Sequence, residues 1–331
     1  MTIEIIAEAA QGYLGDPLPK ATLLVRMAAA AQADAAKLQL VIADELCTPD
    51  YRHYDLFRAL EMDEASWRSI AETASAAGVG LYFDIFGDAS LAIAEALPIR
   101  GIKIHSTDVA NLPLLESIAR SGVRRVLLSA GGTFAAELRR AVDILRDKDL
   151  VLLHGFQGYP TRNEDNMIAR IHDLQHLYPG RTIGFADHVP ETDPLRLWLS
   201  AVAVGAGARV LEKHITTALA LREEDHEAAL NPDEFRMYVA NMRAADAALG
   251  AFSTAEDFAM SASETAYRTN MKKQVVAARG LAAGTVLAPE HIVLKRTSAT
   301  EGVIRDPAKA LGRALARPVS RGIAVREEDL A

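Results

Sequence analysis

Two histidines with acidic neighbours lie at the ends of apolar segments of this chain. His188 stands in the stretch GFADHV, directly after Asp187, and His214 stands in RVLEKHIT, two residues after Glu212. Two imidazoles with a nearby carboxylate and water can bind Mn²⁺, Mg²⁺, Fe²⁺ or Zn²⁺. A single histidine of this kind more often hydrogen-bonds a loop carbonyl, but two of them on adjacent strands favour a metal site.

Two lysines interrupt segments that are otherwise apolar: Lys37 in AAKLQLV and Lys103 in GIKIHS. A lysine is costly to bury without an anionic partner. One interpretation is a structural ion pair with Glu8 or Glu212. The other is a clamp for a phosphate or carboxylate, and it is favoured because the glycines of SAGGT could also approach an anion. The hydroxyls that could assist such a clamp belong to Ser106 and Ser129.

Short apolar segments alternate with segments of helical periodicity between residues 4 and 249. The expected strands are Glu4–Ala9, Ala35–Val41, Val79–Phe86, Gly101–Ser106, Arg125–Ser129, Leu150–His154, Thr182–Phe185 and Arg209–His214. The expected helices lie near residues 20–33, 64–77, 88–97, 112–121, 134–146, 165–177, 193–205 and 232–249. This α/β alternation predicts a (β/α)8 TIM barrel. An open doubly wound sheet is the alternative, but no glycine-rich dinucleotide loop follows the first strand.

The active site of such a barrel lies at the carboxyl ends of its strands. The expected strand ends carry Glu8, Lys37, Gln39, Asp84, Lys103, Ser106, Ser129, His154, Asp187, His188, Glu212 and His214. Because so many polar groups meet at one rim, the pattern favours an enzyme. His105 is either a further imidazole at this rim or a packed structural residue, and His53 is expected to be solvated.

Composition excludes several other classes of protein. The 331 residues carry a net charge of −8, which gives no general attraction for nucleic acid or an anionic membrane. Cys47 is the only cysteine, so no internal disulfide and no multi-cysteine zinc site can form. The first residues lack the pattern of a signal peptide, and no apolar run is long enough for a bilayer span. We therefore expect a cytoplasmic protein.

The chain divides into three expected regions. Residues 1–250 form the barrel, and residues 251–273 form a polar linker rich in Ser and Thr. Residues 274–331 form a small β-rich domain with turns at Gly280, Gly284 and Gly322. A domain of this size has a thin core, so we expect it to dock on another surface.

In chain order, a series of motifs resembles that of the N-acetylneuraminate (sialic acid) synthases. The motifs are IIAEAAQGYLGD, ADAAKLQ, GIKIHSTDVANLPLL, LLSAGG, LLHGFQGYPT, IGFADHV, LEKHIT and EDHEAALNPDEF. The final VVAARGLAAGTVLAPEHIVLKR resembles the antifreeze-like, or SAF, domain that is appended in this family. The resemblance covers nearly the whole chain.

The resemblance implies a condensation of phosphoenolpyruvate with an open-chain sugar aldehyde, usually that of an amino sugar. Carbon 3 of the enol phosphate attacks the aldehyde, water adds to carbon 2, and phosphate leaves. The product is a 3-deoxy-2-keto acid of the nonulosonic type. The implied metal is Mn²⁺, with Mg²⁺, Fe²⁺ or Zn²⁺ possible, bound by His188 and His214.

The resemblance also implies roles for other residues. The catalytic acids are Glu8, Glu212 and Asp187. The residues expected to contact the substrates are Lys37, Gln39, Lys103, Ser106, Asp108, Ser129, Gln157, Tyr159, Asp225 and Arg296. Arg296, in the SAF domain, is expected to reach the active site of a partner in a domain-swapped homodimer.

Several positions depart from the motifs of the family. An Asn-His pair is replaced by Gly12-Tyr13, and a Ser by Ala186. A Ser-Thr pair becomes Asp84-Ile85, KIASGE becomes KIHSTD, and KRPG becomes KRTS. These changes predict retained metal-assisted carbonyl chemistry with altered substrate recognition.

Two alternatives to the condensation remain. Asp84 and Ala186 favour a metal-dependent aldolase or lyase that acts on a sugar-derived 2-keto acid without phosphoenolpyruvate. A sugar-binding or ice-interacting protein is less favoured, because an inert binder needs no combined set of lysines, histidines and acids.

Overall fold

The computed structural model describes residues 2–250 and 259–331 and contains two compact units, residues 1–250 and 251–331. Each unit is described by itself. In the described part of the chain, no helix is both long and apolar enough to cross a membrane.

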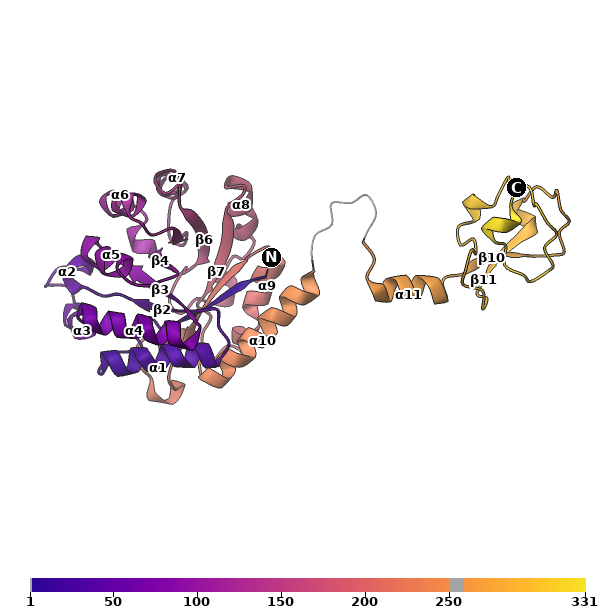
Figure 1. The fold of residues 1–331 in the computed structure, drawn as a ribbon. Coiled ribbons are helices and arrows are strands. Elements are labelled where there is room, and N and C mark those ends of the chain that lie inside the picture. Colours follow the sequence, from indigo (N-terminus) through magenta and orange to yellow (C-terminus); the bar gives the residue numbers. More distant parts are fainter. Residues whose placement is uncertain (1, 251–258) are drawn as a thin grey trace. The chain divides into compact units, whose positions relative to one another are not determined.

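The first unit is a closed barrel of eight parallel strands, and it confirms the predicted fold (Figure 1). The strands are β1 (Glu4–Glu8), β2 (Ala35–Gln39), β3 (Gly80–Ile85), β4 (Gly101–Ile104), β5 (Arg125–Ser129), β6 (Asp149–Gly155), β7 (Thr182–Asp187) and β8 (Val210–Ile215). Each strand pairs with the next, and β1 closes the barrel on β8 with Glu8 beside His214. A short strand, β9 (Ala229–Leu230), adds to β8 beyond the barrel.

Helices surround the barrel. They are α1 (Pro17–Ala30), α4 (Glu64–Ala77), α5 (Asp88–Glu95), α6 (Leu112–Arg120), α7 (Ala135–Ile144), α8 (Arg170–Leu177), α9 (Leu199–Gly205) and α10 (Pro232–Leu249). Local signals set their bounds: in α4 the Asp63 side chain accepts from the Ser66 amide, and Gly78 ends the helix at φ 69°. Two short helices were not predicted, α2 (Ala43–Leu46) and α3 (Tyr54–Leu60), both between β2 and α4.

Strand alternation divides the interior of the barrel into layers. One apolar cluster at the inner face consists of Ile6, Ala35, Tyr82, Leu127, Val151, Leu153 and Val210. At the amino ends of the strands, Glu4 pairs with Arg125 at 2.6 Å and accepts from the Tyr82 hydroxyl at 2.8 Å, which closes the barrel below this layer. On five of the strands, the inward position two residues further along is polar, namely Glu8, Lys37, Asp84, Ser129 and Glu212.

The second unit is the expected small β-rich domain. Strands β10 (Gln274–Ala277) and β11 (Ile292–Lys295) pair antiparallel over a core that includes Val275, Leu287 and Val325. Of the segment expected to be a linker, residues 251–258 lie outside the described residues, and the rest contains a helix, α11 (Ala262–Met271). The Ser261 side chain caps this helix and Glu264 reaches back to the Ser261 amide, a capping box that the sequence S-A-S-E permits.

Candidate active site

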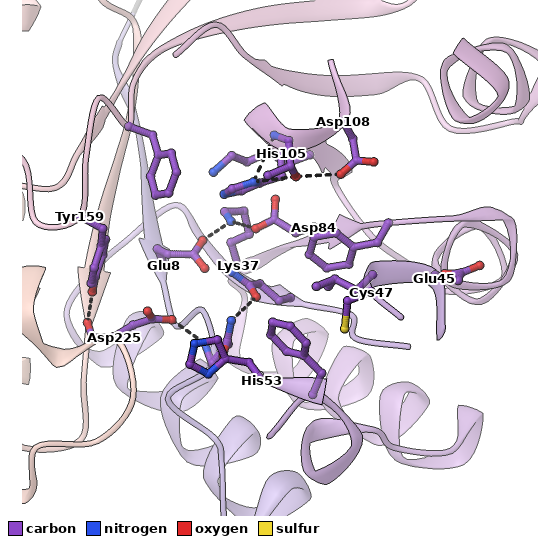
Figure 2. A pocket seen from close by; sticks show the side chains of 18 of the residues that line it. Glu8, Lys37, Glu45, Cys47, His53, Asp84, His105, Asp108, Tyr159 and Asp225 are labelled. Atoms are coloured by element: carbon purple, nitrogen blue, oxygen red, sulfur yellow. Dashed lines mark hydrogen bonds and ion pairs between the residues drawn. The ribbon is translucent and has the colours of Figure 1, made fainter. Parts of the chain in front are cut away.

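A cavity of about 900 Å³ opens at the carboxyl ends of the barrel strands (Figure 2). Most of the residues predicted from the sequence line it: Glu8, Lys37, Gln39, Lys103, Asp108, Tyr159, His188, Glu212, His214 and Asp225. Strand alternation explains their convergence. Glu8 follows the inward Ile6 by two residues, and Glu212 follows the inward Val210 in the same way. The floor of the cavity is thus the polar layer directly above the apolar one.

The floor is a cluster of two lysines and three carboxylates. The Lys37 ammonium contacts Glu8, lies 2.5 Å from Asp84 Oδ2 and lies 3.8 Å from Glu212 Oε2. The Lys103 ammonium lies 2.6 Å from Glu212 Oε1. Ion pairs with Glu8 and Glu212, the alternative that the sequence analysis weighed against an anion clamp, are present. Figure 2 shows Lys37 between Glu8 and Asp84.

These carboxyl groups differ in their affinity for protons. Burial, together with the charges of Glu212 and Asp84, raises the pKa of Glu8 to about 8, although Lys37 opposes this shift. Burial also acts to raise the pKa of Asp84, but the ammonium groups of Lys37 and Lys103 outweigh it and the net pKa shift is downward. Near neutral pH, Glu8 therefore retains a proton while Asp84 is ionised.

Two buried oxygens of the floor carboxylates have no hydrogen-bond partner among the described residues. These atoms are Asp84 Oδ1 and Glu212 Oε2, whereas Glu8 Oε2 contacts the Lys37 ammonium. A buried acceptor without a donor is costly, so the floor favours a ligand that supplies hydrogens.

The two predicted histidines lie together above this floor. The ring centroids of His188 and His214 are 5.2 Å apart, and the Tyr159 ring lies within 6 Å of both. Burial is the largest cause that lowers the pKa of each imidazole, to about 3 for His188, so both rings are neutral. The His188 Nδ1 lies 3.1 Å from the Ala186 carbonyl, to which it can donate, leaving Nε2 as the acceptor.

Neutral imidazoles with a free nitrogen fit a divalent metal. Among residues 2–250 and 259–331, however, no three His, Cys, Asp or Glu side chains are grouped so that they could hold one. The chain itself thus offers the histidine pair, and further ligands would have to come from substrate or water.

Asp187, which the sequence analysis assigned a catalytic role, does not line the cavity. It is fully buried and accepts from Lys213 at 2.9 Å, from the Ser200 hydroxyl at 2.7 Å and from the Val189 amide at 3.0 Å. Asp187 lies on the outer face of β7 because His188 takes the inward position beside it. The structure thus places Asp187 in the turn that carries His188 and outside the cavity lining, and its catalytic role stays a prediction.

Four other predicted residues lie outside the cavity lining. Ser129 is buried on β5, and Ser106 begins a short 3-10 turn that ends at Asp108. The Gln157 amide lies 3.4 Å from the His154 ring. Arg296 belongs to the second unit, where its Nε donates to the Met271 carbonyl at 2.8 Å.

His105 is placed at the rim, where it lines the cavity. Its ring meets the edge of Phe156 at 4.9 Å, and its Nδ1 lies 3.1 Å from the Thr107 hydroxyl, which donates to Asp108. Burial and the charge of Lys103 lower the pKa of His105 to about 4, so this imidazole is neutral.

A second wall of the cavity comes from the unpredicted helices α2 and α3 and from the segment 47–53 that joins them. The lining residues of this segment include Cys47, Tyr51, Arg52 and His53. The Tyr51 ring stacks on Phe57 at 6.3 Å with an interplanar angle of 7°, and His53 meets the Tyr51 ring at 5.6 Å. His53 is exposed, as expected, yet it faces the cavity. The density of aromatic residues in CTPDYRHYDLF is the signal that could have located this wall.

Loops carry the opposite wall. Asp225 adopts a left-handed backbone at φ 62°, accepts from the Gln11 amide at 3.3 Å, and has its own carbonyl bonded by the Tyr159 hydroxyl. Burial, aided by Glu224 and Glu227, raises the pKa of Asp225 to about 6. Tyr13 packs in the core behind this wall, and its hydroxyl donates to the Gln39 carbonyl at 2.6 Å.

Between these walls, the ends of β5, β6 and β7 approach one another closely. A Cβ at Gly131 would lie 1.9 Å from the Gly155 carbonyl oxygen, and a Cβ at Gly155 would lie 2.2 Å from the Ala186 carbonyl oxygen. Gly155 also has φ 131°, which side chains disfavour. In this part of the rim the backbones of neighbouring strand ends lie too close together for a side chain at Gly131 or Gly155.

Comparisons with known proteins agree over most of the chain. The NeuB family model matches residues 24–254, and the SAF domain model matches residues 273–331. An uncharacterized protein of Methanocaldococcus jannaschii, MJ1065, is 30% identical over 88% of this chain and 84% of its own. The N,N'-diacetyllegionaminic acid synthase of Legionella pneumophila is 28% identical over 89% of this chain and 86% of its own.

A solved structure is similar as well. The N-acetylneuraminic acid synthetase of Leptospira borgpetersenii, in complex with citrate, superposes with a TM-score of 0.73 and 28% identity. The match covers 82% of this chain and 93% of that one.

Proposed function

Because the chain belongs to the NeuB family, a family that includes C–C bond-forming sugar acid synthases, we propose that it condenses phosphoenolpyruvate with an open-chain sugar aldehyde. The products are a 3-deoxy-2-keto acid of the nonulosonic type and phosphate. The observation that supports this most strongly is the meeting of the His188–His214 pair with the Lys37–Lys103 cluster in one cavity. Neither group alone would suit both an anionic donor and a carbonyl acceptor.

Lys103 is the floor ammonium that is partly open to the cavity, and we assign it to an anionic group of the donor. Its side chain is 7% exposed, against 1% for Lys37. Carbon 3 of the donor attacks the aldehyde carbon, and the carbonyl oxygen takes up a proton. Water then adds to carbon 2 and gives up a proton, and the C–O bond to phosphate breaks to leave the 2-keto acid.

Two acids of the floor are placed to move these protons. Glu8 and Glu212 both line the cavity, and Glu212 Oε2 has no hydrogen-bond partner among the described residues. We assign Glu212 to accept the proton of the attacking water, and Glu8 to supply the proton to the carbonyl oxygen of the sugar. Tyr159, Gln39 and Asp225 line the side of the cavity where hydroxyl groups of the acceptor would bind.

His188 and His214 would hold a divalent metal, with Mn²⁺ as the first candidate. Such an ion, when bound, supplies a positive charge that polarises a carbonyl oxygen. The neutral state of both rings supports this assignment, since protonated imidazole cannot bind a metal.

A second candidate is an aldolase or lyase that does not use phosphoenolpyruvate. The observation that favours it is the Asp84 carboxylate on Lys37, because it adds a negative charge where an anionic donor is expected.

The deciding experiment measures phosphate release from phosphoenolpyruvate with Mn²⁺ across a panel of aldoses. The matched control is His188→Ala. Release that requires both an aldose and His188 supports the condensation and identifies the acceptor class. If protein that binds Mn²⁺ releases no phosphate with any aldose, the condensation is refuted and the aldolase is favoured.

We also propose that the chain is a homodimer in which Arg296 of one protomer completes the cavity of its partner. The resemblance to the family supports this arrangement. Arg296 is an exposed side chain of the second unit, so it is accessible for such a role.

A further inference from the structure

The floor of the cavity holds three acidic side chains and two ammonium groups, and Asp84 is the acid that contacts Lys37 from β3. It lies on β3 in register with Gln39 of β2 and Lys103 of β4, which places it between the two lysine-bearing strands. Its side chain is 1% exposed, and it lines the cavity. Asp84 is therefore part of the built floor and cannot move into bulk solvent to make room for a ligand.

The Lys37 ammonium donates one of its N–H groups to Asp84, and an anionic ligand would need that N–H group. The Lys37 ammonium has three hydrogens, and it already contacts Glu8 and Asp84, with Glu212 Oε2 at 3.8 Å. Asp84 Oδ1 has no hydrogen-bond partner among the described residues, and it is an acceptor and not a donor. A phosphate or carboxylate oxygen that approached Lys37 would meet the Asp84 carboxylate first.

Lys103 has a different setting. Among residues 2–250 and 259–331, its ammonium forms an ion pair with one carboxylate, that of Glu212 at 2.6 Å, and its side chain is more exposed than that of Lys37. A single anionic group can thus be bound at the floor through Lys103. A second anionic group on the same donor finds no free ammonium there.

We propose that Asp84 is a specificity-determining residue that withholds Lys37 from the donor, so that the floor binds one anionic group of the donor through Lys103. This inference rests on the proposed function for the identity of the donor, phosphoenolpyruvate. The inference predicts that the phosphate group of phosphoenolpyruvate adds little to the affinity of the protein for this donor.

The test is equilibrium binding by titration calorimetry, without acceptor, of phosphoenolpyruvate and of pyruvate, which has the carboxylate but no phosphate. In the unaltered protein we expect the two affinities to agree within about threefold. Asp84→Asn frees Lys37, and it should strengthen phosphoenolpyruvate binding at least tenfold while pyruvate binding changes less than threefold. Asp149→Asn removes the same charge at the opposite end of the barrel, where it pairs with Arg125, and should change neither affinity.

Lys103→Met provides a test that does not depend on the folding of the Asp84 variant, and it should weaken both ligands at least tenfold. Asp84→Ser serves as a smaller neutral variant, and thermal unfolding confirms that each protein is folded. The inference is overturned if the unaltered protein prefers phosphoenolpyruvate to pyruvate more than tenfold and Asp84→Asn gives no gain. The titration measures binding and needs no turnover. The two affinities can therefore be compared even if the protein does not catalyse the condensation. If the unaltered protein binds pyruvate but not phosphoenolpyruvate, and Asp84→Asn binds phosphoenolpyruvate as well, the result would support the inference and count against the condensation.

Discussion

The buried pair of Asp187 and Lys213 allows a prediction with a definite magnitude. Both side chains are fully buried, on the outer faces of β7 and β8. Asp187→Asn keeps the shape of the side chain but removes its charge, so that the Lys213 ammonium loses its buried countercharge and keeps neutral acceptors such as the Val189 carbonyl, at 3.3 Å. Leaving one partner of a buried ion pair uncompensated costs about 3–5 kcal/mol. The barrel should lose this much free energy of unfolding.

Tryptophan fluorescence makes the measurement specific for the barrel. The two tryptophans of the chain, Trp67 and Trp198, both belong to the first unit, so urea unfolding followed by their emission reports that unit. If the free energy of unfolding falls by about 3 kcal/mol per M of urea, the urea concentration at the unfolding midpoint should fall by about 1 M or more. Combining Asp187→Asn with Lys213→Met should recover much of the loss, because no buried charge then lacks a partner. A cost below about 1 kcal/mol, or a double variant as unstable as the sum of the single ones, would refute the reasoning.

Two further predictions concern the cavity and the second unit. Because the pKa of Asp225 is raised to about 6, the stability that its protonated form contributes is present below pH 4 and is lost as the pH rises through 6. Asp225→Asn should therefore stabilise the barrel by about 1–2 kcal/mol at pH 7 and by little at pH 4, and a difference that is constant between these pH values would contradict this. Arg296→Ala should lower the turnover of a protein that light scattering shows to be dimeric. A monomeric protein with unchanged activity in the variant would exclude the shared site.

Much of the barrel and of its floor could be predicted from the sequence. The strands are short, apolar and evenly spaced, so their existence follows from burial on both faces. Lys37 and Lys103 were informative because a lysine inside an apolar strand requires an acid nearby, and Glu8 and Glu212 are indeed their partners.

Other features could not be predicted in the same way. Helices α2 and α3 span four and seven residues, too few for helical periodicity to distinguish them from a loop. The position of Asp187 outside the cavity follows from strand alternation, which points adjacent side chains to opposite faces, and the sequence analysis did not apply this alternation to Asp187 and His188. The contact between Asp84 and Lys37 depends on the register between β2 and β3. This register cannot be inferred from the sequence of either strand alone.

The bare backbone at the ends of β5, β6 and β7 has a consequence for how this enzyme can acquire new substrates. Any residue larger than glycine at Gly131 or Gly155 would collide with the carbonyl of the next strand, so that sector of the rim cannot be varied. Variation is open instead in the exposed segment around Tyr51 and Arg52 and in the loop that carries Asp225. A library for altered acceptor choice should therefore randomise these two walls and leave the glycine sector fixed.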